Sequence, residues 1–345
     1  MAEKLAIVVF SLGGPDSPAA VRPFLFNLFF DPYIIQLPTP LRWLIATLIS
    51  TTRAKKSQGY YAKLGGKSVL PEETQAQAKA LEAVVQSRGD DAKVFVFMRY
   101  WHPMADEVIT QLKAYGPSRV VVLPLYPQFS TTTTETSMVA LKRSAARHGF
   151  TVPLESICCY PTEDGFIAPV TEMISRDYAA AAEHGKPRIL LSAHGLPQKI
   201  IDAGDPYQWQ VEQTTAQVVT KLGIPDLDWS ICYQSRVGPV AWIGPSIESE
   251  IERAGKDGVP LVVAPIAFVS EHVETLVELD DTMRAFAKDA GVPFYVRTPA
   301  VRTEPRFVSL LASLDRVLKS CASPCPAAGA RICPPRFSKC PHHAH

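Results

Sequence analysis

The chain has 345 residues, and its 35 lysine and arginine residues almost balance its 34 aspartate and glutamate residues, giving a formal net charge of +1. This balance argues against a nucleic-acid-binding protein, which would carry a clear basic surplus. Hydrophobic residues make up 47% and charged residues 20% of the sequence, which excludes disorder over the whole chain. The length is enough for two domains that each bury a core of their own.

The seven cysteines are unevenly distributed. Four of them lie in the last 25 residues, and none precedes Cys158. A disulfide-dense secreted protein would have them spread along the chain. The N-terminus has no signal-peptide pattern, and no stretch reaches the roughly 18 apolar residues of a membrane-spanning helix. We therefore expect a soluble, cytoplasmic protein whose clustered cysteines bind metal.

Short β-branched apolar runs alternate along the chain with longer amphipathic stretches. The runs predict strands at Leu5–Ser11, Lys93–Arg99, Arg119–Leu125, Arg188–His194, Trp229–Gln234, Leu261–Ala267 and Phe294–Arg297. The stretches between them predict helices that include Glu72–Arg88, Met104–Tyr115, Glu135–His148 and Val211–Leu222. Continuous apolar runs such as VVVLPLY and ILLSAH are typical of strands buried on both faces. The alternation therefore predicts a doubly wound α/β architecture with parallel sheets.

The strands fall into two groups, separated by a segment after Cys159 that has the composition of a hinge. We expect two similar α/β domains, residues 1–165 and 166–318, and a cysteine- and proline-rich tail at 319–345. In open α/β sheets, ligands bind beyond the carboxyl ends of the strands. The residues that follow each strand are therefore the first place to look for a site.

The first three strands end in segments with more than one interpretation. Gly13 and Gly14 permit a tight turn but match neither a dinucleotide nor a P-loop motif. Arg99, followed by three ring side chains, suits a clamp for a flat, carboxylate-bearing ligand, although aromatic core packing explains the same pattern. The hydroxyl-rich loop after Tyr126 fits an ordinary polar loop equally well.

The later strand ends carry groups with clearer chemistry. His194 closes a buried strand and is followed by Gly, Leu and Pro, so its ring is expected to face a cleft. On a regular helix, four acids would fall within about 80° of one another: Glu271, Glu274, Glu278 and Asp281. This acidic face either is solvated or faces the cleft, and His272 lies off it in regular geometry. A histidine among carboxylates and aromatics suits proton abstraction beside a cation.

Six segments of the sequence resemble, in order, those of the ferrochelatases, which insert ferrous iron into protoporphyrin to make haem. They are LGGP, RYWHP, YPQFSTTTTE, SAHGLP, CYQSRVGPVAWIGP and PIAFVSEHVETLVELD, and the resemblance covers most of residues 5–320. SAHGLP together with HVETLVELD is a specific combination. The resemblance implies a lyase with two Rossmann-like, chelatase-type domains that flank a cleft.

The resemblance also implies roles for individual residues. His194 matches a histidine that abstracts pyrrole protons or binds metal, and Glu274 lies across the macrocycle from it. Glu278 and Asp281 continue an acidic line for protons or metal, and a π-type irregularity would bring His272 to the cleft. The residues expected to hold the substrate Fe²⁺ are His194, Glu274, Glu278 and His272. Those expected to bind porphyrin are Leu12, Arg99, Tyr100, Tyr126, Gln234, Ser235 and Trp242.

Residues 24–49 are rich in apolar side chains, in the segments FLFNLFF, YIIQLP and PLRWLIATLIS, but are too interrupted to span a bilayer. One interpretation is a buried helix of the first domain. The other is an exposed apolar lip that touches the membrane and receives porphyrin from it. The family resemblance favours the lip, and with it peripheral contact of a cytoplasmic protein with the inner face of the membrane.

The cysteine tail resembles that of animal ferrochelatases, which carry a [2Fe–2S] cluster held by C-terminal cysteines and one internal cysteine. The implied ligands are Cys158, Cys325, Cys333 and Cys340, with Cys159 and Cys321 as substitutes. Four thiolates also suit structural zinc, and an unligated tail is a third interpretation. A cluster there would be structural or sensing rather than catalytic.

Two rival functions remain open. The chain could load metal into another tetrapyrrole, as a coproporphyrin ferrochelatase or a cobalt or nickel chelatase would; the apolar lip and the full HVETLVELD segment argue against the cobalt or nickel enzymes. A two-domain carrier that binds its ligand without chemistry is the non-enzymatic alternative.

The expected partners are protoporphyrin IX and ferrous iron, and the dimeric animal enzymes raise the option of a homodimer.

Overall fold

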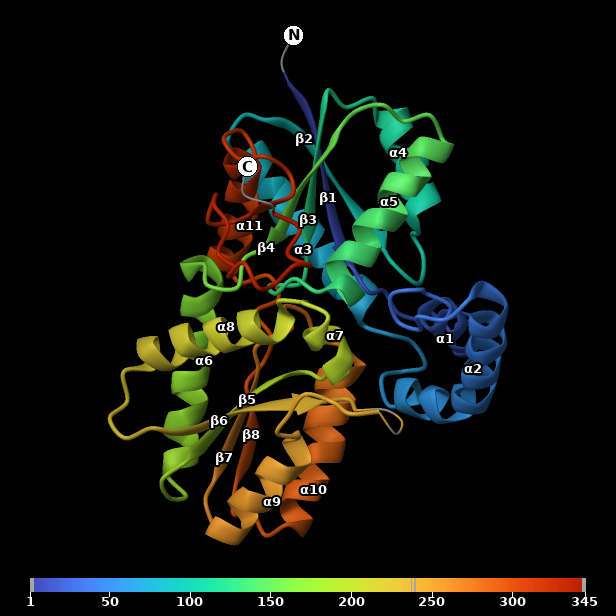
Figure 1. Ribbon diagram of the computed structural model, residues 1–345. Helices are drawn as coiled ribbons and strands as arrows, with labels where there is room; N and C mark the ends of the chain where they lie inside the picture. Colours follow the sequence, from blue (N-terminus) through green and yellow to red (C-terminus); the bar gives the residue numbers. More distant parts are fainter. Residues whose placement is uncertain (1–2, 237, 239, 343–345) are drawn as a thin grey trace. The chain divides into compact units, whose positions relative to one another are not determined.

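The structure is a computed structural model that describes residues 3–236, 238 and 240–342 (Figure 1). It divides into two compact units, and each is described by itself. The first comprises Met1–Cys159, Leu311–Arg331 and Pro341–His345, and the second comprises Tyr160–Leu310 and Ile332–Cys340. The chain thus enters the second unit at Tyr160, and its cysteine-rich tail contributes to both. Among the described residues, no helix combines the length and apolarity needed to cross a bilayer.

The first unit is built on a parallel sheet with the strand order β2-β1-β3-β4-β9. Its strands are β1 (Lys4–Ser11), β2 (Asp91–Met98), β3 (Arg119–Pro124), β4 (Leu154–Cys159) and β9 (Cys325–Pro326). Its helices are α1 (Val21–Phe29), α2 (Thr39–Ala62), α3 (Leu70–Gln86), α4 (Ala105–Tyr115) and α5 (Thr136–Arg147), with a 3₁₀ turn at Pro18–Ala20 and a π-helical turn at Thr131–Glu135.

Helices cover both faces of this sheet, which explains why β1 is buried from Leu5 to Ser11. On one face, Val8 and Phe10 of β1 pack with Ile109 of α4 and Leu141 of α5 in a single apolar core. Helix α3 lies against β1 and β2 on the other face (Figure 1). Leu12, Arg99 and Tyr126 follow the carboxyl ends of β1, β2 and β3 respectively.

The second unit has its own parallel sheet, with the strand order β6-β5-β7-β8. Its strands are β5 (Arg188–His194), β6 (Asp228–Gln234), β7 (Leu261–Pro265) and β8 (Tyr295–Arg297). Its helices are α6 (Asp164–Ala182), α7 (Gln198–Asp202), α8 (Tyr207–Leu222), α9 (Ile247–Asp257), a π-helical segment (Glu274–Met283) and α10 (Arg284–Asp289). Helix α11 (Pro305–Val317) crosses the boundary between the units.

The two sheets share one topology, because in each the first strand lies between the second and the third. In such a sheet the chain leaves adjacent strands toward opposite faces, and this switch point is where open α/β folds bind ligands. In the second unit the switch point lies between the ends of β5 and β7, so His194 is located there. The predicted fold class, two similar doubly wound α/β units, is confirmed.

All seven predicted strands are present, with ends that differ by two residues at most. Two strands were not predicted: β4, and the two-residue β9, which pairs with β4 in parallel. Glu274–Met283 is π-helical, so the π-type irregularity that the family resemblance implies is present, and the acidic face expected on a regular helix is not. Hydrogen bonds from i to i+5 widen each turn, so side chains spaced for an α-helix no longer share one face.

Candidate active site

His194 is the last residue of β5 and is fixed there by backbone contacts. The hydroxyl of Tyr207 donates to the His194 carbonyl at 3.0 Å, and the Gly195 amide donates to the Gln234 carbonyl of β6 at 2.8 Å. A Cβ on Gly195 would lie 2.9 Å from that same Gln234 carbonyl oxygen, closer than real Cβ contacts allow. Glycine is therefore required for the two strand ends to approach.

Two imidazoles flank one carboxylate at this point. Oε2 of Glu274 lies 3.3 Å from Nδ1 of His194 and 3.3 Å from Nε2 of His272. The His194 contact has the distance of an ion pair without the alignment of a hydrogen bond. Phe268 packs on the His272 ring with 4.5 Å between ring centroids, which restricts that ring. The structure thus brings together three of the four residues expected to hold Fe²⁺.

The charges of these groups shift their pKa values in opposite directions. Burial would raise the pKa of Glu274, but the imidazoles of His194 and His272 outweigh it and hold that pKa well below its usual range. Burial would lower the pKa of His194, but the negative charges of Glu274 and Glu278 outweigh it and raise that pKa. Without substrate, Glu274 is therefore a carboxylate, and His194 keeps its proton to a higher pH than free imidazole does.

Glu278, the fourth expected iron ligand, lies in a polar cradle made by the end of β6. Its carboxylate accepts hydrogen bonds from the Ser235 amide at 2.8 Å, the Ser235 hydroxyl at 2.5 Å and the Gln234 side-chain amide at 3.3 Å. Burial and the neighbouring charge of Glu274 nevertheless raise the pKa of Glu278, against the effect of the Ser235 hydrogen bonds. Two carboxylates on one helical segment thus have opposite tendencies to bind a proton.

Gln234 connects these two carboxylate residues. Its side-chain amide donates to the Glu274 backbone carbonyl at 2.9 Å as well as to Glu278. The Ser192 hydroxyl donates to the amide oxygen of Gln234 at 2.8 Å, which orients the side chain. Gln234 was expected to bind porphyrin, whereas in the structure it is fully buried and spans the two acids.

The acidic line expected on a regular helix is not formed. Asp281 is exposed, while Glu274 and Glu278 are half-buried. Glu271 precedes the helical segment, and its carboxylate accepts from the Arg297 guanidinium at 2.9 and 3.1 Å and from the Ala300 amide at 2.9 Å. Of the four acids, Glu274 and Glu278 therefore lie together at this site, because Glu271 is bound by Arg297 ahead of the helical segment and Asp281 is exposed.

Arg297, at the carboxyl end of β8, was not identified from the sequence. Its guanidinium also pairs with Asp280 at 2.7 Å, so it links the turn before the π-helical segment to the segment's own Asp280. Thr275 extends this network, since it accepts from the His272 amide at 3.0 Å and donates to Glu271 at 2.5 Å. The signal in the sequence was an arginine that closes the predicted strand Phe294–Arg297.

Trp242 packs beside the histidine strand. Its ring would be 3.4 Å from a Cβ at Gly195, and its backbone forms an isolated antiparallel bridge with Pro197. The indole nitrogen is buried and has no hydrogen-bond partner among the described residues. It therefore leaves an unused donor beside the strand that ends in His194, and porphyrin binding by Trp242 stays a prediction.

In the first unit, Arg99 and Tyr100 converge on an acid that sequence reasoning missed. Oδ2 of the buried Asp31 accepts from the Arg99 guanidinium at 2.6 Å, the Tyr100 hydroxyl at 2.8 Å and the Thr136 hydroxyl at 2.5 Å. Burial and the Asp31 charge raise the pKa of Tyr100 well above its usual range. Tyr100 is thus a neutral, buried member of this network, and no motif in the sequence pointed to Asp31.

Leu12 and Tyr126 follow β1 and β3 in the same unit, and both are partly exposed. The Leu12 carbonyl accepts from the Tyr100 amide at 3.1 Å. The Tyr126 ring packs edge-on against Phe10 at 6.1 Å. Both therefore stand at the carboxyl edge of the first sheet, near Arg99 in the fold of this unit.

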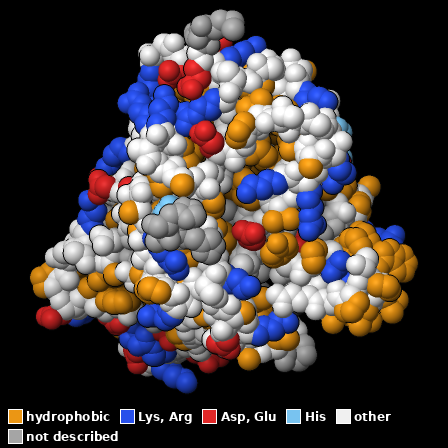
Figure 2. Space-filling view, turned by 45° about the horizontal axis from the view of Figure 1, so that its top comes forward, with side chains coloured by type: hydrophobic (Ala, Val, Ile, Leu, Met, Phe, Trp, Pro, Cys, Tyr) orange, Lys and Arg blue, Asp and Glu red, His pale blue; other side chains and the backbone are white. Residues whose placement is uncertain are grey.

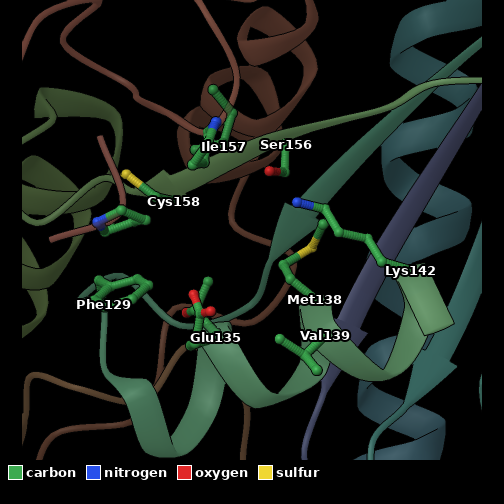
Figure 3. A pocket seen from close by; sticks show the side chains of 11 residues that line it. Phe129, Glu135, Met138, Val139, Lys142, Ser156, Ile157 and Cys158 are labelled. Atoms are coloured by element: carbon green, nitrogen blue, oxygen red, sulfur yellow. The ribbon is translucent and has the colours of Figure 1, made fainter. Parts of the chain in front are cut away.

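Cys158 lies at the end of β4 beside a small cavity of about 40 Å³ (Figure 3). The side chain is buried, and its sulfur is 3.5 Å from that of Cys159. Pro324 and Pro341 of the tail line the cavity together with Phe129 and Glu135. The tail therefore covers Cys158 within the first unit.

The tail cysteines occur in two groups. Cys325 of β9 is buried and joined by a disulfide to Cys321, and both sulfurs lie within 4.8 Å of a His342 ring nitrogen. Cys333 and Cys340 belong to the second unit, where they are buried in an apolar cluster with Phe337 and Trp209. Buried thiols suit iron–sulfur ligation, but Cys325 can supply a thiolate only after the disulfide is reduced.

Helix α2 carries an exposed apolar face. Four of its large apolar side chains are about half exposed or more: Leu41 (46%), Trp43 (53%), Leu44 (58%) and Leu48 (61%). Figure 2 shows apolar side chains gathered on the projection that α1 and α2 form. Of the two interpretations of residues 24–49, a wholly buried helix is therefore wrong for α2, whereas Val21, Phe24 and Leu25 of α1 are buried.

Comparisons with known proteins agree with this arrangement. The sequence profile of the ferrochelatase family matches residues 4–317. A ferrochelatase of Caulobacter vibrioides (strain NA1000 / CB15N) is 50% identical over 345 residues, which covers 99% of this chain and 98% of that protein. A ferrochelatase of Rickettsia bellii (strain OSU 85-389) is 50% identical over 348 residues, covering 98% and 95%.

Among solved structures, SirB from Bacillus subtilis with Fe³⁺ superposes with a TM-score of 0.52, covering 91% of this chain and 95% of that one. At 13% identity this likeness shows the fold alone. The family profile and the two relatives extend over nearly the whole chain, including His194 and the Glu274 segment. The chain therefore belongs to the ferrochelatase family.

Proposed function

We propose that this chain inserts Fe²⁺ into protoporphyrin IX to form protohaem, with release of two protons, as the last step of haem biosynthesis. It acts as a lyase. The observation that carries the proposal is the group of His194, His272 and Glu274, a carboxylate held between two imidazoles at 3.3 Å. A non-catalytic carrier has no need of such a group, whereas metal insertion must both remove protons and handle a cation.

His194 and Glu274 are the proposed catalytic residues. Insertion removes two protons from pyrrole nitrogens, and an imidazole at the end of β5 is suited to accept them. The raised pKa of His194 reflects the charge of Glu274. Fe²⁺ beside Glu274 offsets that charge and so lowers the pKa of His194, which favours loss of any proton it holds to solvent and the unprotonated form that can accept one from pyrrole. Metal arrival and proton acceptance are thereby coupled through one carboxylate.

The substrate iron is held in this proposal by His194, His272, Glu274 and Glu278. Imidazole and carboxylate groups both bind ferrous iron. Of the two carboxylates, Glu278 is the better acceptor for a proton on its way from His194 to solvent, because the pKa of Glu278 is raised and that of Glu274 is lowered. Gln234 contacts both acid residues and keeps them in register.

The proposed porphyrin-binding residues come from both units. They are Leu12, Arg99, Tyr100, Tyr126, Gln234, Ser235 and Trp242. Residues 1–165 are proposed as the domain with the apolar lip, 166–318 as the domain with the catalytic histidine and acidic segment, and 319–345 as the cluster-binding tail. For Tyr100 and Gln234, whose polar groups are engaged in internal hydrogen bonds, the proposed role is to orient their neighbours.

A direct assay with two porphyrins tests the proposed substrate. Purified protein is supplied anaerobically with Fe²⁺ and either protoporphyrin IX or coproporphyrin III, and the haem product is quantified. The proposal predicts a higher kcat/KM for protoporphyrin. Preference for the four-carboxylate coproporphyrin would favour a coproporphyrin ferrochelatase, and binding of either porphyrin without haem formation would point to a carrier.

We further propose that the cysteine tail holds a [2Fe–2S] cluster through Cys158, Cys325, Cys333 and Cys340. All four side chains are buried, and thiolates are the ligands such clusters require. When bound, the cluster supplies a rigid cross-link and a redox-sensitive centre. The grouping of Cys321, Cys325 and His342 supports an alternative, a single zinc ion bound after reduction of the disulfide.

Absorption and metal analysis separate these alternatives. The cluster predicts a brown protein with iron and acid-labile sulfide in equal amounts, and loss of the visible absorption in Cys158→Ser. Cys321→Ser is the matched control and should retain the colour. A colourless protein with one zinc per chain that is lost in His342→Ala would favour the zinc site and overturn the cluster.

We propose finally that the exposed apolar face of α2 gives peripheral contact with the inner face of the cytoplasmic membrane. Its four half-exposed side chains form a patch of the kind that binds interfaces. Co-sedimentation with lipid vesicles should fall when Trp43 and Leu48 are changed to Glu, whereas Lys55→Glu on the same helix is the charge control. Equal losses would indicate electrostatic attraction alone.

A homodimer is a further option, which rests on the family resemblance. Analytical ultracentrifugation of the purified chain tests it by measuring the molecular mass in solution.

A further inference from the structure

The first unit contains a cavity of about 280 Å³ that the proposed function does not use in full. It lies between the turn after α1, the end of β2, the start of α4 and one side of α5. The α5 residues that line it have the spacing of a single helix face: Thr136, Val139, Ala140, Arg143 and Arg147. On this measure of volume a single water molecule needs only about 10–15 Å³, so the cavity has room for a small molecule.

The lining is strongly cationic. Arg99, Arg143 and Arg147 contribute three guanidinium groups against one carboxylate, Asp106. Arg147 pairs with Asp106 at 2.6 Å, whereas Arg143 makes no ion pair or hydrogen bond within the described part of the chain. The positive charge is therefore only partly neutralised by neighbouring groups.

Arg99 keeps unused hydrogen-bond donors although its guanidinium is paired with Asp31. Its Nη2 donates to Asp31 at 2.6 Å and its Nε to Thr136 at 3.0 Å, which fixes the guanidinium plane. Its Nη1 makes no hydrogen bond to any residue that the structure describes. A fixed fork with one open N–H₂ group is suited to an oxygen anion.

The start of α4 forms a further wall. Met104, Ala105 and Asp106 line the cavity there, and the carboxylates of Asp106 and Glu107 offset the partial positive charge of the first helical turn, since Glu107 accepts from the Met104 amide at 2.7 Å. Phe97 and Val139 add apolar side chains to the lining. The cavity thus combines three cationic side chains with apolar ones.

We propose that this cavity binds a small oxyanion, a compact molecule that carries carboxylate or phosphate groups. Guanidinium groups match both in bidentate geometry. The cavity shares Arg99 with the proposed porphyrin site, so its binding is tested on the protein free of iron and porphyrin.

Isothermal titration calorimetry at low ionic strength tests the proposal with two probes, inorganic phosphate and citrate. Binding of either to the intact chain is expected, and Arg143→Gln should weaken it by about tenfold through loss of a charge-assisted contact. Arg22→Gln, an exposed arginine on α1 outside the cavity, is the matched control and should bind normally. Binding of citrate alone would identify carboxylates as the ligand class, and binding of phosphate alone would identify phosphates.

A second variant tests the cavity itself without changing charge. Ala140→Leu fills part of the cavity and should abolish binding while the circular dichroism spectrum stays unchanged. The proposal is wrong if neither probe binds the unmodified chain, or if Arg143→Gln and Arg22→Gln weaken binding equally. Normal binding by a folded Ala140→Leu protein would place the anion elsewhere and equally contradict it.

Discussion

Nδ1 of His194 lies 3.3 Å from the carboxylate of Glu274, and this contact links the protonation of the two groups. His194, with a raised pKa, contributes stability below about pH 6.5 that is lost as the pH rises through its folded-state pKa. Glu274, with a lowered pKa, contributes stability above about pH 4.3 that is lost as the pH falls through its folded-state pKa. The pair is therefore most stabilising between those limits.

Replacing Glu274 by Gln should lower the pKa of His194. Removal of the negative charge leaves burial, which disfavours the imidazolium, as the main remaining influence together with Glu278. Histidine ring signals followed by NMR across a pH titration measure this directly. Glu252→Gln, an exposed acid on α9, is the control and should leave the titration unchanged. An unchanged His194 pKa in Glu274→Gln would show that the contact does not set its protonation.

Gln234→Leu should reduce haem formation at least tenfold while the chain remains folded. The substitution removes the donor to the Glu274 carbonyl and to Glu278, and it leaves the Ser192 hydroxyl without its acceptor. We expect a loss of about 1–3 kcal/mol in the free energy of unfolding. Urea denaturation and the haem assay check the two effects.

The control for this change is Gln217→Leu on the exposed face of α8, which should have neither effect. If Gln234→Leu destabilised the protein but kept full turnover, Gln234 would be structural only.

Gly195→Ala should impair both stability and turnover. The added methyl group would lie 2.9 Å from the Gln234 carbonyl, so the ends of β5 and β6 must move apart. Overpacking of this kind destabilises by about 1–3 kcal/mol. The matched control is Gly59→Ala in α2, which has no atom within 4 Å of the new Cβ and should be neutral or stabilising. Thermal unfolding compares the two, and equal behaviour would refute the close approach.

Asp31→Asn should be severely destabilising although it changes few atoms. Oδ2 of Asp31 accepts three donors, and Oδ1 accepts the Tyr33 amide. An Asn side chain has one oxygen, so in either orientation its own N–H₂ group meets a donor. Loss of a buried charge partner costs about 3–5 kcal/mol. Asp16→Asn, at an exposed position, is the control in urea denaturation; similar midpoints would contradict this account of the network.

Much of the fold could be predicted from the sequence, because buried parallel strands such as β1 and β5 are continuous apolar runs. Strand β4 was missed, since LESICC has polar residues at its second and third positions and ends in cysteines. The two residues of β9 carry no periodic signal. Strand β9 exists only through its pairing with β4, from which it is separated by more than 160 residues, and local sequence patterns do not encode such a pairing.

The site was predicted in part for a similar reason. His194 could be found because it ends a buried strand, and Glu274 and Glu278 because they lie after one. The separation of Glu271 from them could not be predicted from periodicity, because its carboxylate is bound by Arg297 and the Ala300 amide, which follow it by 26 and 29 positions. Asp31 and Arg297 act through partners distant in the sequence, Thr136 and Glu271 respectively, and only the folded chain brings them together.

The most direct test of the central claim is stopped-flow measurement of porphyrin fluorescence after Fe²⁺ is added to the protein–protoporphyrin complex. The wild-type chain should quench the fluorescence in a fast phase that yields haem. His194→Ala should bind protoporphyrin with similar affinity and lose that phase by at least a hundredfold, since no group remains at β5 to accept the pyrrole protons. Insertion at a near wild-type rate in a folded His194→Ala protein would contradict the assignment of His194 and Glu274 as the catalytic pair.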